Sequence, residues 1–348
     1  MFRRFFVLIA LIAFSTTCFA EAAKDFDIKG VIRFRLESDF VPKTTKMDYD
    51  FTYLQVTKTF GDNFSFVFAP GIIRSSLSVN STSIKNDTLN FVVYAGNFKI
   101  NDVTRGYGDY GISVVGGQYF SPFFVMEQYY QPFKFIEKPL DFKLFPNTIT
   151  PLGFMVSKNF LENVIRASMA YVSGAGAWNS ELYAGLYNDN VNAGGVHLMV
   201  SLFPFMKNES SAMKDLSLTV NIMSIARTTA RSSYNLLLGY KYEKFATSFE
   251  YAGAYSSIAT NKVSAMSVGA SYDVWGPMQV LGRYDYADIK AVTQTFYLTN
   301  INNVFLLGLN TKWFDGHFQV ATTYDQDYNP STKATANRRF MLATQTNL

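Results

Sequence analysis

Six charged side chains lie close together in residues 120–150. Three are acids and three are bases: Glu127, Lys134, Glu137, Lys138, Asp141 and Lys143. The segment also contains four prolines and many aromatic residues, and it is the longest break in the strand pattern described below. Charges of both signs at such density can act on ions that pass close by, because little bulk water lies between them. Whether they do so depends on the elements that hold the segment.

Other residues with chemical potential are few. His197 and His317 are the only histidines, and neither has the spacing of a zinc site. A Ser–His hydrolase using His197 is conceivable, but no motif ties a serine to it. Residues 106–111 spell GxGxxG, yet a strand is expected after them, where a nucleotide-binding motif requires a helix. We therefore expect no enzyme, no cofactor and no metal site.

The first 20 residues are typical of an export leader. Arg3 and Arg4 precede a short apolar run, residues 5–14, and the small residues Cys18 and Ala20 suit a signal peptidase. The apolar run is too short to span a bilayer as a helix. We expect a cleaved signal peptide at 1–20, with Glu21 first in the mature chain. A lipoprotein interpretation of Cys18 is the weaker alternative, because residues 15–17 lack the usual lead-in.

Composition narrows the class of protein. Without Arg3 and Arg4 the chain has 29 basic (31 − 2) and 27 acidic residues, a near-balance that argues against nucleic acid as a partner. Aromatic residues make up 17%, and the only cysteine lies in the leader. After the leader, no apolar stretch approaches the roughly 18 residues of a spanning helix. An exported chain of this kind fits a membrane β-barrel.

Period-two alternation is the strongest structural signal. From residue 26, apolar Phe26, Ile28 and Ile32 alternate with polar Asp27 and Lys29. The pattern returns at 216–222, 235–242, 278–286, 305–313 and 318–325. A soluble sandwich alternates too. However, charges on the polar face and aromatic residues near strand ends favour a barrel that faces lipid outside and water inside.

Connections between the expected strands fall into two classes. Short ones lie at 61–63, 159–163, 243–244, 274–277 and 314–316, and longer polar ones at 41–47, 73–87, 256–261, 288–302 and 326–337. Short turns belong to the periplasmic rim and long loops to the outside, so an even number of strands must separate two short turns. Nine strand-like segments lie between Asp62 and Glu243. Assigning 182–187 to an outer loop, 174–194, restores parity and predicts about 16 strands, the last at 338–348.

The expected fold is therefore all-β, a transmembrane antiparallel β-barrel over residues 21–348. A barrel of this size leaves an aqueous lumen, into which we expect residues 120–150 to fold; a surface loop covering the mouth is the alternative. Strand one begins by about residue 26, which leaves no room for an N-terminal plug. Inward positions predicted to line the pore are Arg33, Arg35, Arg166, Arg283, Glu250 and Asp285. The expected function is passive diffusion of small hydrophilic solutes and ions, with a weak preference for anions. A structural or adhesive surface protein is the alternative.

One part of the sequence resembles a known family. Residues 117–123 (GQYFSPF), Glu127 and residues 135–140 (FIEKPL) resemble the phosphate-selective porins, of porin O and porin P type; residues 151–154 (PLGF) and 201–204 (SLFP) extend the likeness. The resemblance implies a 16-stranded homotrimer in the bacterial outer membrane, with its third loop folded inward. That family lines its constriction with arginines and lysines. The balanced charges of 120–150 depart from this pattern and do not support phosphate selectivity.

Overall fold

The computed structural model describes residues 26–40, 44–48, 52–77, 86–103, 111–131, 151–173, 194–208, 210–226, 231–256, 262–290, 303–314, 317–329 and 334–347. These residues form strands and a single helix, α2 (Pro122–Tyr130). The strands are β1 (Phe26–Asp39), β2 (Thr44–Asp48), β3 (Thr52–Phe60), β4 (Phe64–Leu77), β5 (Asn86–Ile100), β6 (Ile112–Gln118), β7 (Leu152–Phe160), β8 (Ile165–Ser173), β9 (Gly194–Leu202), β10 (Ser217–Ala226), β11 (Arg231–Tyr242), β12 (Phe245–Ser256), β13 (Lys262–Trp275), β14 (Met278–Lys290), β15 (Asn303–Trp313), β16 (Phe318–Asn329) and β17 (Ala334–Asn347). Within the described residues, no helix has the length and apolar character needed to cross a membrane.

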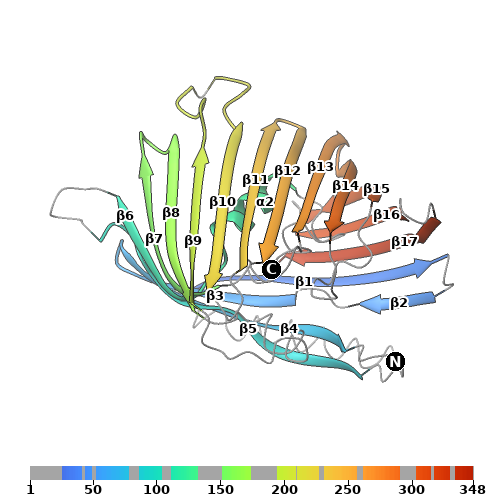
Figure 1. Cartoon of the computed structure of the whole chain (residues 1–348), viewed down its shortest axis with the longest axis horizontal. Helices are drawn as coiled ribbons and strands as arrows, with labels where there is room; N and C mark the ends of the chain where they lie inside the picture. Colours follow the sequence, from blue (N-terminus) through green and yellow to red (C-terminus); the bar gives the residue numbers. More distant parts are fainter. Residues whose placement is uncertain are drawn as a thin grey trace.

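The strands form one sheet that closes on itself (Figure 1). From β3 to β17 each strand pairs antiparallel with its sequence neighbours, and β1 pairs with β17. On its other side β1 pairs first with β2, through residues 35–39, and then with β3, through residues 26–31. The two short strands therefore occupy successive parts of one strand position beside β1. Counted in this way, the barrel has 16 strands. The predicted fold class and strand number are confirmed, and the pairing of β1 with β17 closes the sheet, so that its first and last strands are not free edges.

The parity argument also holds for the described strands. The eight strands β4 to β11 lie between the turn at 61–63 and the turn at 243–244. Residues 174–193, which include the strand-like segment 182–187, lie outside the described residues, so their outer location stays a prediction. Gly61 has a φ of +60°, in the left-handed region that glycine tolerates without steric cost. It makes the abrupt reversal between β3 and β4 possible.

Several strands are longer than the sequence pattern predicts. Residues 44–48 form β2 inside the predicted connection 41–47, β4 extends to Leu77, and β16 and β17 take up most of 326–337. These extensions are rich in serine, threonine and asparagine. Where both faces of a strand meet polar surroundings the alternation of side chains fades, although the backbone ladder continues. Period-two analysis therefore ends a strand too early.

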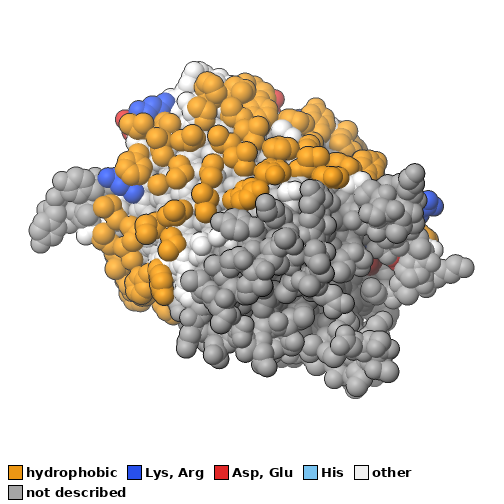
Figure 2. Space-filling model, viewed as in Figure 1, with side chains coloured by type: hydrophobic (Ala, Val, Ile, Leu, Met, Phe, Trp, Pro, Cys, Tyr) orange, Lys and Arg blue, Asp and Glu red, His pale blue; other side chains and the backbone are white. Residues whose placement is uncertain are grey.

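Apolar side chains are exposed and polar side chains are buried, the reverse of what a soluble protein shows. In β10, Val220 and Ile222 are 39% and 46% exposed, whereas Thr219 and Asn221 are fully buried. The same contrast runs along β9, β14 and β15. Figure 2 shows hydrophobic side chains gathered over the outward face of β7 to β12, at the upper left of the view. An apolar outer face with a polar inner face is the pattern of a barrel surrounded by lipid.

Aromatic pairs mark the rim of short turns. Ring centroids lie 5.7 Å apart in Phe60–Phe64, 6.3 Å apart in Tyr240–Phe245 and 5.8 Å apart in Trp313–Phe318, and each pair flanks a turn. Lysines lie over aromatic rings at the same rim: the Lys158 ammonium is 4.9 Å from the Phe160 ring centroid. Aromatic girdles with snorkelling cations are characteristic of the boundary between lipid and water.

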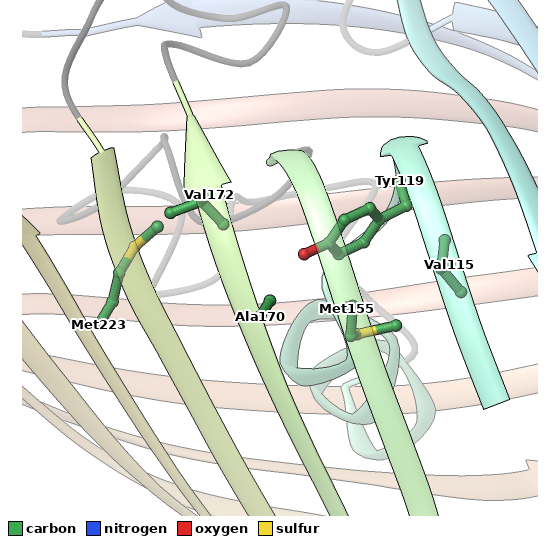
Figure 3. Packing of buried hydrophobic residues seen from close by; sticks show 6 residues of the cluster. All are labelled: Val115, Tyr119, Met155, Ala170, Val172 and Met223. Atoms are coloured by element: carbon green, nitrogen blue, oxygen red, sulfur yellow. The ribbon is translucent and has the colours of Figure 1, made fainter. Parts of the chain in front are cut away.

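The inner face also carries apolar clusters, one of which lies next to the start of α2. Val115, Tyr119, Met155, Ala170, Val172 and Met223 are buried together on β6, β7, β8 and β10, with Tyr119 just after β6 (Figure 3). The Tyr119 ring lies across the inner face of β7, toward Met155 and Ala170. Burial raises the pKa of the Tyr119 phenol above its usual value. The inside of the barrel is therefore not uniformly polar, and this apolar part of it lies where the chain leaves the wall to form α2.

Helix α2 lies inside the barrel, behind β10 and β11 in the view of Figure 1, and contacts β11 and β12. Pro122 occupies its first turn, where the missing N–H costs nothing. The helix ends at Tyr130, and the Gln131 N–H donates to the Glu127 carbonyl at 2.9 Å. Gln131 precedes Pro132, and a residue before proline is disfavoured in helical conformation. The sequence predicted a break from the wall at 120–150 but did not predict a helix within it.

Candidate functional site

Apolar contacts fix α2 on the inner wall. Phe123 is fully buried and Tyr130 is 1% exposed, and they pack with Met199 of β9 and Leu237 of β11. Burying a side chain of this size stabilises a structure by about 1.5–3 kcal/mol. The helix is thus a packed element of the interior rather than a loose loop.

The position of Tyr130 depends on a glycine in the wall. A Cβ at Gly239 would lie 2.2 Å from Cδ2 of the Tyr130 ring, so only glycine permits this contact. The Tyr130 hydroxyl donates to the Asp215 carbonyl at 3.0 Å, in the connection between β9 and β10. Burial raises the pKa of the phenol to about 12, so it stays a neutral donor at ordinary pH.

A pair of carboxyl groups joins α2 to β12. Glu127 and Glu250 are both fully buried, and they interact where α2 contacts β12. Asn235 of β11 donates to Glu250 Oε1 at 3.4 Å. Two carboxyl groups buried side by side are costly when both are ionised, because like charges repel and neither is solvated. Glu127, predicted to line a constriction, is buried at the contact between the helix and the wall, and its role at a constriction stays a prediction.

The carboxyl pair belongs to a band of hydrogen bonds on the inner face of β9 to β12. The His197 ring is bonded through Nε2 to Asn221 Oδ1, and Asn221 Nδ2 donates to Asn235 Oδ1 at 3.4 Å. Asn235 then reaches Glu250, as described above. His197 is only 3% exposed and is held by an amide, which is the environment of a structural histidine. Sequence reasoning missed Asn221 and Asn235, although both occupy inward positions of alternating strands.

On β14, ion pairs take the place of the neutral hydrogen bonds that join β9 to β12. Arg283 Nε and Nη2 donate to the two carboxylate oxygens of Asp285 at 2.7 and 2.8 Å, and both side chains are 1% exposed. Ser267 of β13 donates to Asp285 Oδ1 at 2.6 Å. Two predicted lining residues thus neutralise each other in a bidentate pair.

A second ion-paired group lies on β16, β17 and β1. Arg339 Nε donates to Asp325 Oδ1 at 2.9 Å, and Arg339 Nη1 lies 3.7 Å from Glu37 Oε1. Six residues along the same two strands, β1 and β17, Arg33 Nε donates to Gln345 Oε1 at 2.8 Å. Arg339 was not among the predicted lining residues. Its inward position follows from the outward Phe340 and Leu342, so the alternation of the last strand contained the signal.

Arg166 occupies a different environment. Its guanidinium carbon lies 4.6 Å from the centroid of the Phe203 ring, and its Nη2 lies 4.0 Å from Met206 Sδ. Both partners belong to the connection between β9 and β10, at the short-turn rim. Arg166 is therefore at one end of the lumen rather than near its middle.

The remaining predicted site residues cannot be placed in the same way. The backbone of Arg35 lies in β1, opposite Ala343 and Asp48, but its side chain is outside the described part. Lys134, Glu137, Lys138, Asp141 and Lys143 also lie outside the described residues. Their role at a constriction stays a prediction. Among the described residues, no group of three or more His, Cys, Asp or Glu is arranged to hold a metal ion.

Comparison with known proteins identifies the fold. No family model and no curated protein matches the sequence. Among solved structures, OmpF of Salmonella typhi in complex with daunomycin is similar, with a TM-score of 0.62 and 11% identity, over 93% of this chain and 97% of that one. The outer membrane channel DcaP of Acinetobacter baumannii gives 0.58 and 10%, over 93% and 97%. The trimer form of OmpT, an outer membrane protein of Vibrio cholerae, gives 0.57 and 11%, over 93% and 99%. The class defined by the fold is the closed transmembrane β-barrel; in this chain helix α2 follows β6.

Proposed function

We propose that this chain is an outer-membrane protein that forms a water-filled channel for passive diffusion of small hydrophilic solutes and ions. The observation that carries the proposal is the 16-stranded barrel, whose outer face is apolar and whose inner face is largely polar. A barrel of this size is too wide for its own wall side chains to fill. Helix α2, held by Phe123, Tyr130 and the Glu127–Glu250 pair, narrows the lumen from one side.

Charge preference in this channel is expected to be weak. Arg283 and Arg339 are bound to acids, so much of the inner charge cancels locally. Arg166 is held by an aromatic ring and a thioether, and it supports a small preference for anions. The three acids and three bases of 120–150 oppose a specific phosphate channel. We therefore propose a general channel and not one of the phosphate-selective type.

The proposal includes export and assembly. Residues 1–20 act as a cleaved leader, and the mature chain assembles as a homotrimer surrounded by outer-membrane lipid. The family resemblance supports a trimer, and the similar structure from Vibrio cholerae is described in a trimer form. N-terminal sequencing of outer-membrane material should start at or near Glu21. Chemical cross-linking in membranes should give a product of three chains.

Conductance in a planar bilayer tests the function. The refolded barrel should insert in discrete steps of current, and a salt gradient should give a small reversal potential with the sign of weak anion preference. A heat-denatured sample of the same preparation is the control for detergent leakage. A folded barrel that inserts without conducting would contradict the channel proposal and favour a structural or adhesive surface role.

A further inference from the structure

The outward face of the barrel has a hollow over β14, β15 and β16. A cavity of about 330 Å³ is lined by Tyr284 of β14, Asn303 and Phe305 of β15, and Gln326 of β16. In the strand register Tyr284 lies opposite Phe305, and Phe305 lies opposite Gln326. All four alternate with inward neighbours such as Arg283 and Val304, so the cavity opens away from the lumen.

The polar groups around this cavity are arranged for a ligand that has hydroxyl groups. Asn303 Oδ1 is buried and, among the described residues, has no hydrogen-bond partner. A buried acceptor without a donor is costly, and a ligand hydroxyl would satisfy it. The Tyr324 hydroxyl donates to Gln326 Oε1 at 3.2 Å and so orients the amide beside the cavity. The exposed ring faces of Tyr284 and Phe305 suit the apolar face of a sugar ring.

The side chain of an arginine, Arg338, adds a positive charge beside the cavity. Arg338 of β17 lies opposite Gln326 in the register and has an exposed side chain. Its neighbours Arg339 and Phe340 face inward and outward respectively, which places Arg338 on the outward face with Phe340. A guanidinium binds phosphate through parallel hydrogen bonds. An outward arginine beside aromatic and amide side chains is therefore complementary to a phosphorylated sugar.

The position of the cavity along the strands indicates which part of a lipid it could bind. The cavity lies where β15 begins and near the end of β16, toward the rim of the longer connections, and on β14 it reaches the middle of the strand at Tyr284. Further along the same outward face, Leu307, Leu309 and Leu342 are 51%, 46% and 37% exposed. A lipid with its head group at Arg338 would lay its acyl chains over these leucines.

We propose that the cavity and Arg338 bind the head group of an acylated, phosphorylated glycolipid of the outer leaflet. The phosphate pairs with Arg338, the sugar ring lies on Phe305 and Tyr284, and a sugar hydroxyl donates to Asn303 Oδ1. This goes beyond the proposed channel function, and it rests only on the barrel being embedded with this rim outward. Loss of lipid binding with unchanged conductance, or the reverse, separates the two proposals.

The test is a binding titration on the refolded, full-length mature barrel in mixed micelles. The probes are bisphosphorylated lipid A (an acylated glucosamine disaccharide), the same lipid without phosphates, and phosphatidylglycerol. Arg338→Gln should weaken binding of lipid A roughly ten- to hundredfold, the range for one lost charge-assisted hydrogen bond. Asn303→Ala should weaken it about tenfold and should leave the lipid-free barrel no less stable, because it removes an unsatisfied acceptor.

The controls separate this site from general attraction between charges. Lys158→Gln removes an outward cation at the opposite rim and should leave lipid A binding unchanged. Loss of the lipid phosphates should weaken wild-type binding as much as Arg338→Gln does, and should add nothing in that variant. Heat-modifiable gel mobility checks folding, and Phe305→Leu replaces any variant that fails to fold, with the same expected loss. Equal losses for Lys158→Gln and Arg338→Gln would overturn the proposal. Equal affinity of the wild-type barrel for phosphatidylglycerol and for lipid A would also overturn it. So would a change of oligomeric state in Arg338→Gln with no loss of lipid A binding.

Discussion

The inner wall of the barrel is built in two different ways. From β9 to β12 it is held by neutral hydrogen bonds through His197, Asn221 and Asn235, and it carries α2 on an apolar contact. From β14 through β17 to β1 it is held by bidentate ion pairs and carries no helix among the described residues. The first wall positions an element inside the lumen, whereas the second pairs its buried charged groups with one another. A desolvated charge is costly, and in the second wall each of these acids has an arginine within hydrogen-bond distance.

The largest expected effect concerns the ion-paired wall. Arg283→Met leaves Asp285 buried without its partner and should lower the free energy of unfolding by about 3–5 kcal/mol. Lys29→Met is the matched control, because Lys29 and Asp27 are also two residues apart on one strand but 66% and 55% exposed. It should cost at most about 1 kcal/mol. Urea unfolding of the refolded barrel measures both, and equal costs would remove the distinction between the buried and exposed pairs.

A smaller effect is expected where the helix meets its wall. Gly239→Val places a side chain into the Tyr130 ring and should destabilise the barrel by about 1–3 kcal/mol. Because α2 is displaced, single-channel conductance should change as well. Gly282→Ala on β14 is the control, since its Cβ would meet Leu307 only at an ordinary 3.5 Å. Unchanged conductance in a folded Gly239→Val barrel would show that α2 does not narrow the pore.

The carboxyl pair gives a finer test of the same wall. Glu250→Ala leaves Glu127 buried without this partner and should cost about 1–3 kcal/mol. Glu250→Gln keeps a donor and an acceptor toward Glu127, so stability and conductance should stay close to wild type. If the glutamine variant behaves like the alanine variant, a polar contact between residues 127 and 250 does not hold the helix.

The smallest effects are expected for ion selectivity. Replacing Lys134 and Lys138 with glutamate changes 120–150 to one base and five acids, and should move the permeability ratio toward cations by a few-fold at low salt. The shift should fade as salt rises and screening increases. Arg166→Gln should shift the ratio in the same direction by less, because Arg166 lies at the rim. If neither variant alters the reversal potential, the wall residues Arg33 and Arg339 become the next candidates.

Sequence patterns predicted the strands of the barrel wall better than the hydrogen bonds on its inner face and the helix inside it. Period-two alternation placed Val220 outward and Asn221 inward, because one face must meet lipid and the other must not. Alternation does not determine how far each strand is shifted against the next, and this shift decides that Asn221 reaches Asn235 and that Asn235 reaches Glu250. Helix α2 was missed because nine residues rich in aromatic side chains have little helical preference of their own. Packing on Leu237 and Met199 makes it a helix.

The pairing of β1 with β17 has a consequence for folding. The hydrogen bond between Arg33 and Gln345 joins residues 312 positions apart, and the paired backbones run from Val31 with Asn347 to Asp39 with Arg339. Contacts of such separation carry the largest loop-closure entropy in the chain and form late. Until β17 has left the ribosome and reached β1, both strands present unpaired edges that can join other chains. The polypeptide must therefore be kept from aggregating until β1 and β17 pair, and closure of the barrel is the step that ends this exposure.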